Sequence, residues 1–421
     1  MGFWIFFILI ALCIFSYIYQ KNIFAPAVVF NFVFALVAFA SMFKVSTNGL
    51  ALRTVKINFF TYFLILLGCF CFTIASICVK RTEKKGKNTK TNSTILYTYI
   101  GLTGFGLILN ASKIFSYLKN GGKVQYIYRL STNSAYVENE LSSTAFGDKY
   151  NTFIGNPLYY LLTPYFLTVY FQDKTQKKYL IYSFIFLFLK IITHFSRVEI
   201  MYFMLYFIVL VIMNKREWRI SKNKKKSSFK TIMVFAVITF FMFYVFTLRN
   251  TNYLKTFFDY FGKPLLYMQT LFNYADIHGH CFGYLSTLGI GQFIFGLLEQ
   301  INITPPQLLN LAQQYANEIG AATVLPDGSI YNAFSTCFYY FYVDFGLFGV
   351  ITISFIFGLI SQKMFVRFKS RSDIQAMVCY LILLICIGFS FIRWQLVRSE
   401  IALAFVYAFF LFKKQRALLR K

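Results

Sequence analysis

The chain has 421 residues, of which 58% are hydrophobic, 21% aromatic and only 14% charged. Soluble domains are roughly 45–50% apolar and about 25% charged, so this composition, with a mean hydropathy of +0.58, excludes a soluble globular enzyme, a disordered protein and a fibrous repeat. The net charge of +27 would suggest a nucleic-acid partner for a soluble chain, but in a membrane protein it first raises the question of sidedness.

The predicted fold is an all-α polytopic membrane protein, with residues 1–421 forming a single membrane domain. A crossing helix needs about 20 mostly apolar residues. The N-terminal segment has no positive n-region and no small-residue cleavage site, so we expect a retained span and no removed signal peptide. Segments 179–195 and 198–213 lie so close together that they could also form one broken block. The eleven expected spans are 2–20, 23–43, 58–79, 93–113, 153–172, 179–195, 198–213, 231–248, 336–360, 375–392 and 399–412.

Clusters of Lys and Arg predict the orientation, because loops rich in these residues stay in the cytoplasm. The strongest clusters are 80–90, 215–230, 363–371 and 413–421. Placing all four inside puts the N-terminus outside and the C-terminus inside. This frame has 27 basic and 4 acidic residues inside, and 14 basic and 11 acidic residues outside. Membrane topology thus accounts for nearly all of the excess charge, and no nucleic-acid partner is expected.

Two long connections, 114–152 and 249–335, lie outside in this frame. Loops of this length are usually functional or disordered. The second contains the apolar stretch 293–298 and a helix-like run at 307–319, so we expect it to be folded. All three histidines and 11 of the 15 carboxylates also fall on the outer side, where acid–base chemistry would then take place.

Basic side chains at the expected outer boundary form the first candidate site, for an anionic substrate. They are Lys190, His194, Arg197, Arg249, Arg393 and Arg398. The spacing of Lys190, His194 and Arg197 puts them on one face if their helix is continuous, although Lys190 could instead snorkel to the headgroups. Arginine offers paired donors to phosphate. The set therefore suits a diphosphate at the membrane surface, and simple headgroup anchoring is the alternative.

The segment Asp276-Ile277-His278-Gly279-His280 is the second candidate site. A histidine titrates near neutral pH, so we expect His278 or Asp276 to act as the general base for a hydroxyl group; plain loop polarity is the alternative. Two histidines and one carboxylate without a spaced third ligand indicate a metal only weakly. The eight cysteines include no CxxC pair, so neither a disulfide framework nor a zinc site is expected. We expect no cofactor.

An aromatic run leads into the ninth span. Most of its rings are the interfacial belt that a membrane protein is expected to have. Asp344 is different, since a carboxylate that enters a span needs a partner or a cavity. We treat Asp344 as a candidate catalytic carboxylate, and Asn332 and Tyr342 as candidate contacts to a sugar substrate.

This layout resembles the bacterial oligosaccharide repeat-unit polymerases, the Wzy-type O-antigen and capsule polymerases, over nearly the whole chain. Local matches are Ser196-Arg197 at an outer span boundary, Tyr331-Asn332, and YVDFGLFG at 342–349. The chain departs from the pattern in its second outer loop, where Arg249 is the only arginine. That departure puts an arginine-rich-loop mechanism in doubt.

The resemblance implies a fold similar to the C-type glycosyltransferases and glycosyl transfer at the outer face of the bacterial cytoplasmic membrane. The growing glycan on undecaprenyl diphosphate would be moved onto a new lipid-linked unit, to build O-antigen of lipopolysaccharide or capsular polysaccharide. Arg197, Arg249 and Arg398 would neutralise the leaving diphosphate. Membrane lipids, a flippase and a chain-length regulator are the implied partners.

Three other functions are compatible with parts of the pattern. An O-antigen ligase-like transferase would use the same lipid donor. A non-enzymatic flippase for lipid-linked glycans is disfavoured by the long loop 249–335 and by the lack of a visible repeat. A polysaccharide acetyltransferase would need a His/Asp pair near the cytoplasmic side, where the frame places no histidine.

Overall fold

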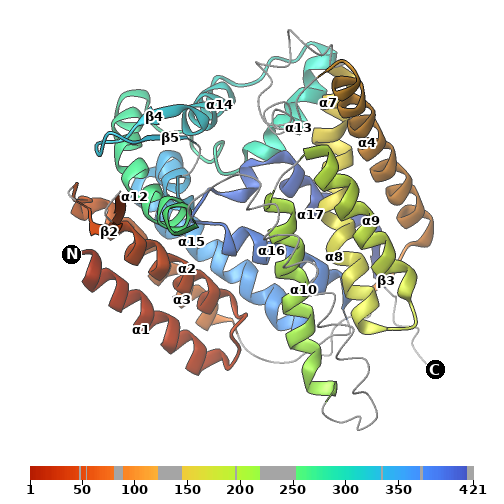
Figure 1. Cartoon of the computed structure of the whole chain (residues 1–421), viewed down its shortest axis with the longest axis horizontal. Helices are drawn as coiled ribbons and strands as arrows, with labels where there is room; N and C mark the ends of the chain where they lie inside the picture. The colour runs from red at the N-terminus through yellow and green to blue at the C-terminus, as the bar shows by residue number, and fades with distance from the viewer. Residues whose placement is uncertain are drawn as a thin grey trace. The chain divides into compact units, whose positions relative to one another are not determined.

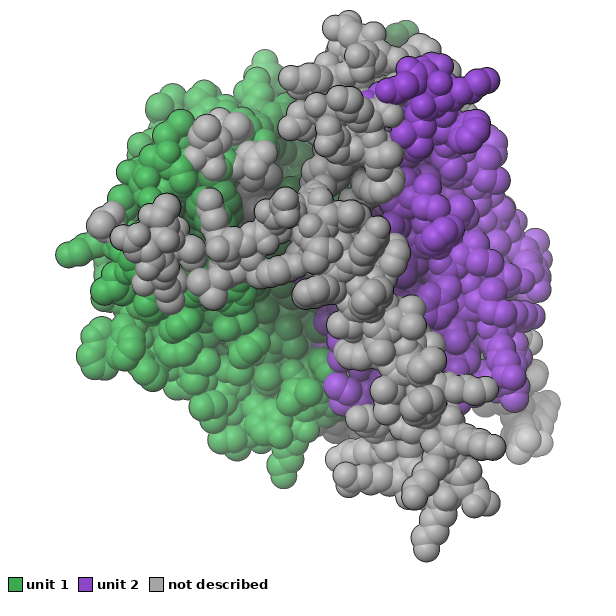
Figure 2. All heavy atoms as spheres, in the orientation of Figure 1, with its two compact units in different colours: residues 1–86, 251–371, 383–402 green, residues 87–250, 372–382, 403–421 purple. Residues whose placement is uncertain are grey.

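The computed structural model describes residues 1–46, 49–53, 55–79, 89–121, 145–194, 197–218, 253–332, 335–369 and 373–414 (Figure 1). The chain forms two compact units, coloured separately in Figure 2. Unit 1 comprises 1–86, 251–371 and 383–402, and unit 2 comprises 87–250, 372–382 and 403–421. The expected eighth span, 231–248, and the centre of the first outer loop, 122–144, lie outside the described residues.

Helices dominate both units. Those of unit 1 are α1 (Gly2–Gln20), α2 (Pro26–Ser41), α3 (Phe59–Cys78), α12 (Tyr253–His278), α13 (Leu288–Leu298), α14 (Gln307–Gly320) and α15 (Cys337–Lys369). Those of unit 2 are α4 (Ser93–Lys119), α7 (Ala145–Tyr150), α8 (Asn156–Gln172), α9 (Lys177–His194) and α10 (Arg197–Trp218). Two further helices, α16 (Ile374–Gly388) and α17 (Ser399–Leu411), contribute residues to both units.

Short elements connect these helices. They are a π-helical turn, η2 (Asn151–Gly155), and two 3₁₀ turns, η3 (Glu299–Ile301) and η4 (Gln395–Val397). The strands form antiparallel pairs, namely β1 (Phe43–Ser46) with β2 (Gly49–Leu52), β4 (Ala322–Val324) with β5 (Ile330–Asn332), and β3 (Thr89–Thr91) with β6 (Phe412–Lys414). The β4–β5 hairpin and α14 show that the second outer loop is folded.

Four of the described helices, α1, α3, α4 and α15, are long and apolar enough to cross a membrane. The shorter apolar helical segments are Pro26–Ser41, Val198–Met213, Leu288–Ile301, Ile374–Gly388 and Ser399–Leu411. This mostly helical chain agrees with the expected all-α membrane protein, and the count of eleven spans stays a prediction. The block 179–213 forms two helices, because α9 ends at His194 and α10 begins at Arg197.

Aromatic side chains and close backbone contacts build the core of unit 1. Phe30 of α2 stacks on Phe72 of α3, with ring centroids 4.2 Å apart, and Phe357 of α15 meets Phe72 edge-on at 5.2 Å. A Cβ atom at Gly358 would lie only 2.5 Å from the carbonyl oxygen of Phe72. The glycine therefore lets α15 approach the backbone of α3, as small residues do between membrane helices.

Helix α15 is broken within the expected ninth span, 336–360. The backbone leaves helical geometry at Phe345 and Gly346, and Gly346 has φ 62°, which favours glycine. The turn that follows α12 packs into the break, with the amide of Cys281 donating to Val343 O and that of Phe282 donating to Asp344 O, both at 3.0 Å. These bonds satisfy carbonyl groups that the break frees.

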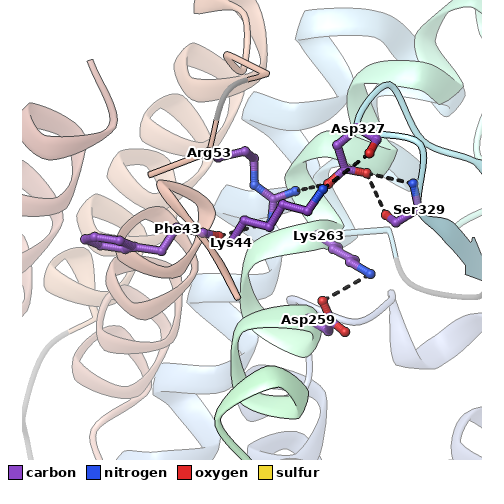
Figure 3. A network of polar contacts seen from close by, with 7 residues as sticks. All are labelled: Phe43, Lys44, Arg53, Asp259, Lys263, Asp327 and Ser329. Carbon is purple, nitrogen blue, oxygen red and sulfur yellow. Dashed lines mark hydrogen bonds and ion pairs between the residues drawn. The ribbon is translucent and has the colours of Figure 1, made fainter. Parts of the chain in front are cut away.

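A buried ion pair joins the two hairpins of unit 1 (Figure 3). Arg53 Nη1 lies 2.8 Å from Asp327 Oδ2, and the two side chains are 3% and 1% exposed. Arg53 Nη2 also donates to Phe43 O at 3.2 Å, while Ser329 donates its amide and hydroxyl hydrogens to Asp327 Oδ1. The pair therefore ties the chain next to β1–β2 to the β4–β5 hairpin of the second outer loop. Beside it, Lys263 pairs with Asp259 on α12 at 3.0 Å.

Contacts within each unit join segments that the charge frame places on the same side of the membrane. Arg53 and Asp327 both belong to its outer side. On its inner side, Lys369 Nζ donates to Gln20 O at 3.5 Å, and β3 pairs with β6. The topology of the frame stays a prediction. The assignment of the inner side to the cytoplasm stays a prediction from the charge asymmetry.

We expect Asp327→Asn to lower the free energy of unfolding by about 3 kcal/mol, because it leaves the buried Arg53 charge uncompensated. Thermal unfolding of the detergent-solubilised protein measures the loss. Asp148→Asn is the matched control, since the Lys113–Asp148 pair is half-exposed and such a pair contributes at most about 1 kcal/mol. Equal effects of the two substitutions would contradict the prediction.

The difference in unfolding free energy between wild type and Asp327→Asn should also depend on pH. Burial alone would raise the pKa of Asp327, but the hydrogen bonds from Ser329 and the charges of Arg53 and Lys44 lower it below its usual value. A lowered folded-state pKa gives stability that is present above the unfolded-state value, near 3.8, and lost as pH falls through the folded value. The gap between wild type and Asp327→Asn should therefore narrow below that pH.

Candidate functional site

The C-terminal end of α12 and the turn after it carry three exposed polar residues, Asp276, His278 and His280, which we call the cluster. Gly279 turns the chain between the two histidines with φ +79°. Tyr315 of α14 fixes this turn, because its hydroxyl donates to Gly279 O at 2.7 Å. Burial, and more weakly the neighbouring Cys281, Tyr274 and Asp276, raise the pKa of Tyr315, so its hydroxyl keeps the proton that it donates.

Each of the two histidines is held through one ring nitrogen. Nδ1 of His278 lies 3.0 Å from Tyr274 O, and Nδ1 of His280 lies 3.1 Å from Val343 O. Because a carbonyl oxygen only accepts, each Nδ1 carries the hydrogen, and the neutral ring keeps its lone pair on Nε2. The Tyr274 ring stacks on His278 at 4.0 Å between centroids, which holds the imidazole in place. Nε2 of His278 can therefore accept a proton from a bound hydroxyl group.

Aromatic rings flank the cluster. Tyr342 of α15 is half-buried, and its ring centroid lies 6.2 Å from that of His280. Phe272 and Phe60 both meet Tyr342 edge-on, with ring centroids 5.1 Å and 5.6 Å from that of Tyr342, respectively. Phe282, which is largely exposed, lies 6.5 Å from His280. The structure thus brings Tyr342 and the cluster together, in a setting that offers ring faces to an apolar or sugar surface.

Asp344 lies behind the cluster, at the break of α15, and is fully buried. Its Oδ1 accepts the amide hydrogen of Leu285 at 3.0 Å, and its Oδ2 accepts that of Ser286 at 2.8 Å. Both oxygens are thus occupied by backbone donors of the turn 281–287. These contacts favour a structural role for Asp344 over the catalytic role that its position in the sequence suggested.

Three further candidates belong to unit 1. Asn332 ends β5, where its backbone is paired with Ala322. Arg393 and Arg398 lie in the connection between α16 and α17, and both are half-buried. Arg398 Nε is 3.5 Å from Glu400 Oε2. These arginines remain candidate contacts for an anion.

Lys190 is buried inside unit 2, with 1% of its surface exposed. Its Nζ donates to Asn156 Oδ1 of α8 at 2.5 Å and lies 5.4 Å from the centre of the Tyr159 ring. The side chain therefore bonds into the helical bundle and does not snorkel to the headgroups. A buried ammonium group in such a bundle is costly and usually functional.

Lys190 and His194 belong to α9, and Arg197 opens α10. The expectation that these three residues share one helix face stays a prediction. The i, i+4, i+7 rule holds only along a continuous helix. The side chains of His194 and Arg197 lie outside the described residues, and so does Arg249.

Glu199 is a buried carboxylate that the sequence reasoning did not single out. It is 5% exposed and accepts a hydrogen bond from the Tyr160 hydroxyl at 2.6 Å. Its place in the first turn of α10 suits a negative charge, because the helix dipole is positive there. The signal was available, since a carboxylate inside an apolar run is rare.

Comparison with protein-family models, with curated proteins and with solved structures gave no match. Among the described residues, no group of three or more His, Cys, Asp or Glu side chains is placed to hold a metal ion. The chemistry that the described cluster supports is proton acceptance at His278.

We expect Asp344→Asn to loosen the turn 281–287, because an amide offers one acceptor where the carboxylate offers two. Hydrogen exchange of the Leu285 and Ser286 amides should speed up about tenfold, which corresponds to roughly 1.4 kcal/mol. Mass-spectrometric exchange on the purified chain measures this. Asp276→Asn, which changes an exposed carboxylate nearby, should leave both amides unchanged; unaltered exchange in Asp344→Asn would exclude the bracing role.

Proposed function

We propose that the chain polymerises oligosaccharide repeat units carried on undecaprenyl diphosphate at the outer face of the bacterial cytoplasmic membrane. The observation that carries the proposal is the exposed Asp276–His278 cluster beside Tyr342, on a folded loop that the charge frame places outside. An exposed imidazole whose Nε2 keeps its lone pair, flanked by aromatic rings, suits a sugar hydroxyl as acceptor. A lipid-linked donor suits a chain whose helices can cross the membrane.

In this proposal His278 is the general base. Its Nε2 takes the proton of an acceptor hydroxyl while that oxygen bonds to the anomeric carbon of the donor sugar. The bond from the anomeric carbon to the diphosphate oxygen breaks, and the diphosphate leaves with the electron pair. Asp276 is the alternative base, and Asp344 holds the turn that follows the cluster.

Cations stabilise the charge that develops on the leaving diphosphate. Arg197, Arg249 and Arg398 are the residues we propose for this role, with Arg393 as a further candidate. Each remains charged at any physiological pH and offers paired donors to phosphate oxygens. We also assign Lys190 and His194 to the binding of the anionic substrate, and Asn332 and Tyr342 to the binding of the glycan.

Loss of the gene should leave single repeat units where wild-type cells carry long chains. Gel separation of surface glycan shows this as the collapse of a ladder to one band. Complete loss of surface glycan would indicate a ligase-like transferase, and trapping of repeat units on the cytoplasmic leaflet would indicate a flippase. An unchanged ladder would rule out all three functions.

His278→Ala should reduce chain elongation by about 100-fold, the size of effect expected for a lost general base. Arg197→Ala, Arg249→Ala and Arg398→Ala should each shorten the chains. Elongation is scored from the ladder at matched protein levels. Gln314→Ala changes an exposed side chain of α14 and is the matched control. Full-length chains in all four site variants would show that the site lies elsewhere.

A further inference from the structure

Helix α13 is unusual among the elements of the second outer loop, because it is apolar and very short. It covers Leu288–Leu298 and contains no charged residue. At 1.5 Å per residue its 11 residues extend about 16 Å, which is about half of the roughly 30 Å hydrocarbon thickness of a bilayer. A helix of this length cannot cross the membrane, and a water-exposed loop gives no reason for its composition.

Aliphatic side chains form an exposed stripe along α13. Ile290, Ile294 and Leu297 follow one another at i, i+4 and i+7, so they lie on one face of α13, and Ile301 follows in the 3₁₀ turn η3. Their side chains are between 38% and 65% exposed. We call this set the α13 stripe. Such a row of large apolar groups on one face marks an interaction surface.

The opposite face of α13 is filled by the protein. A Cβ atom at Gly289 would lie 2.5 Å from Leu396 O, so the helix touches the backbone of the η4 segment. Gln292 accepts a hydrogen bond from Ser399 Oγ at 3.1 Å and bonds to Gln313 of α14. The rotation of α13 about its axis is thus fixed, and the stripe points away from these contacts.

Exposed apolar side chains also occur on α15, one of the helices long and apolar enough to cross a membrane. Phe348 and Ile351 of α15 are exposed. At the break, exposed Phe345 meets exposed Phe282 with ring centroids 6.1 Å apart. Phe282 belongs to the turn 281–287 that leads directly into α13, so this turn attaches the short apolar helix to α15 at an exposed apolar contact.

We propose that α13 is a non-spanning helix inserted in the outer leaflet, and that the α13 stripe contacts lipid acyl chains. The length of the helix, its lack of charge and its attachment to α15 through the turn 281–287 point to lipid as the occupant. Neighbouring α14 has the opposite character, since its apolar residues Leu309, Ala312, Tyr315 and Ile319 are buried and its exposed face is polar. The pair α13–α14 therefore has a lipid side and a water side.

Insertion of α13 sets the height of the Asp276–His278 cluster. The turn 281–287 joins the cluster to α13 and is itself held by Asp344. A helix lying in the leaflet would keep this turn, and the cluster before it, at the level of the lipid headgroups. The inference stands without the proposed reaction, because its tests use no glycan substrate.

The first test uses the unmodified chain in vesicles of phosphatidylethanolamine and phosphatidylglycerol. A trifluoromethyl-phenyldiazirine, a lipid-soluble carbene precursor, is activated by light, and labelled peptides are mapped by mass spectrometry. We expect label in 288–303, as in α1 and α15, and no label in 307–320. Labelled α1 and α15 with an unlabelled 288–303 would overturn the proposal.

A second test locates a single side chain. Ile294→Cys carries a nitroxide label in a chain whose eight native cysteines are replaced by serine, and Asn310→Cys on the exposed face of α14 is the matched control. We expect the label at 294 to collide more with oxygen than with a water-soluble nickel chelate, and the label at 310 to show the reverse. A chelate-accessible label at 294, or one shielded from both reagents by a second copy of the chain, would refute lipid contact.

Discussion

The carboxylate of Asp344 satisfies a constraint on which the outer part of unit 1 depends. A helix that breaks near a membrane frees backbone amide and carbonyl groups, and hydrocarbon offers them no partner. The turn 281–287 fills this need from one side with the amides of Cys281 and Phe282. In return, the Asp344 carboxylate accepts hydrogen bonds from the turn's own amides at Leu285 and Ser286. The break and the turn therefore stabilise each other, and neither would persist alone in an apolar environment.

The groups around the candidate cluster are linked to these hydrogen bonds between the turn 281–287 and the break of α15. His280 is tied to Val343 at the same break, and α12 ends in the turn that Tyr315 fixes. Trp394 reaches the same place from the η4 segment, since its Nε1 donates to Ser286 O at 2.8 Å. Groups that are far apart in the sequence thus acquire fixed positions around one buried carboxylate, which is the rigidity that a site for oriented proton transfer needs.

Hydropathy was sufficient to predict the long apolar helices, but it predicted neither α12 within the second long connection nor the partners of the helices. The apolar runs at 2–20, 58–79 and 336–360 agree with α1, α3 and the first part of α15. The amides that bind Asp344 could not be predicted, because every residue other than proline carries one and the sequence does not distinguish them. The boundary between α9 and α10 agrees with the separation of the expected spans 179–195 and 198–213.

Buried charges show a further limit of reasoning from the sequence, and also its value. The position of Lys190 in an apolar run predicted a costly group with a special role, and the structure adds that Asn156 of a neighbouring helix is its partner. A lipid anchor holds the reactive carbon of a substrate at a fixed distance from the bilayer. Residues that act on it have to be held at that height, and helices that enter the membrane can do so with little freedom. In the proposed function, α15 braced at its break by Asp344 and the apolar half-length helix α13 that precedes it in the chain would provide that control of height.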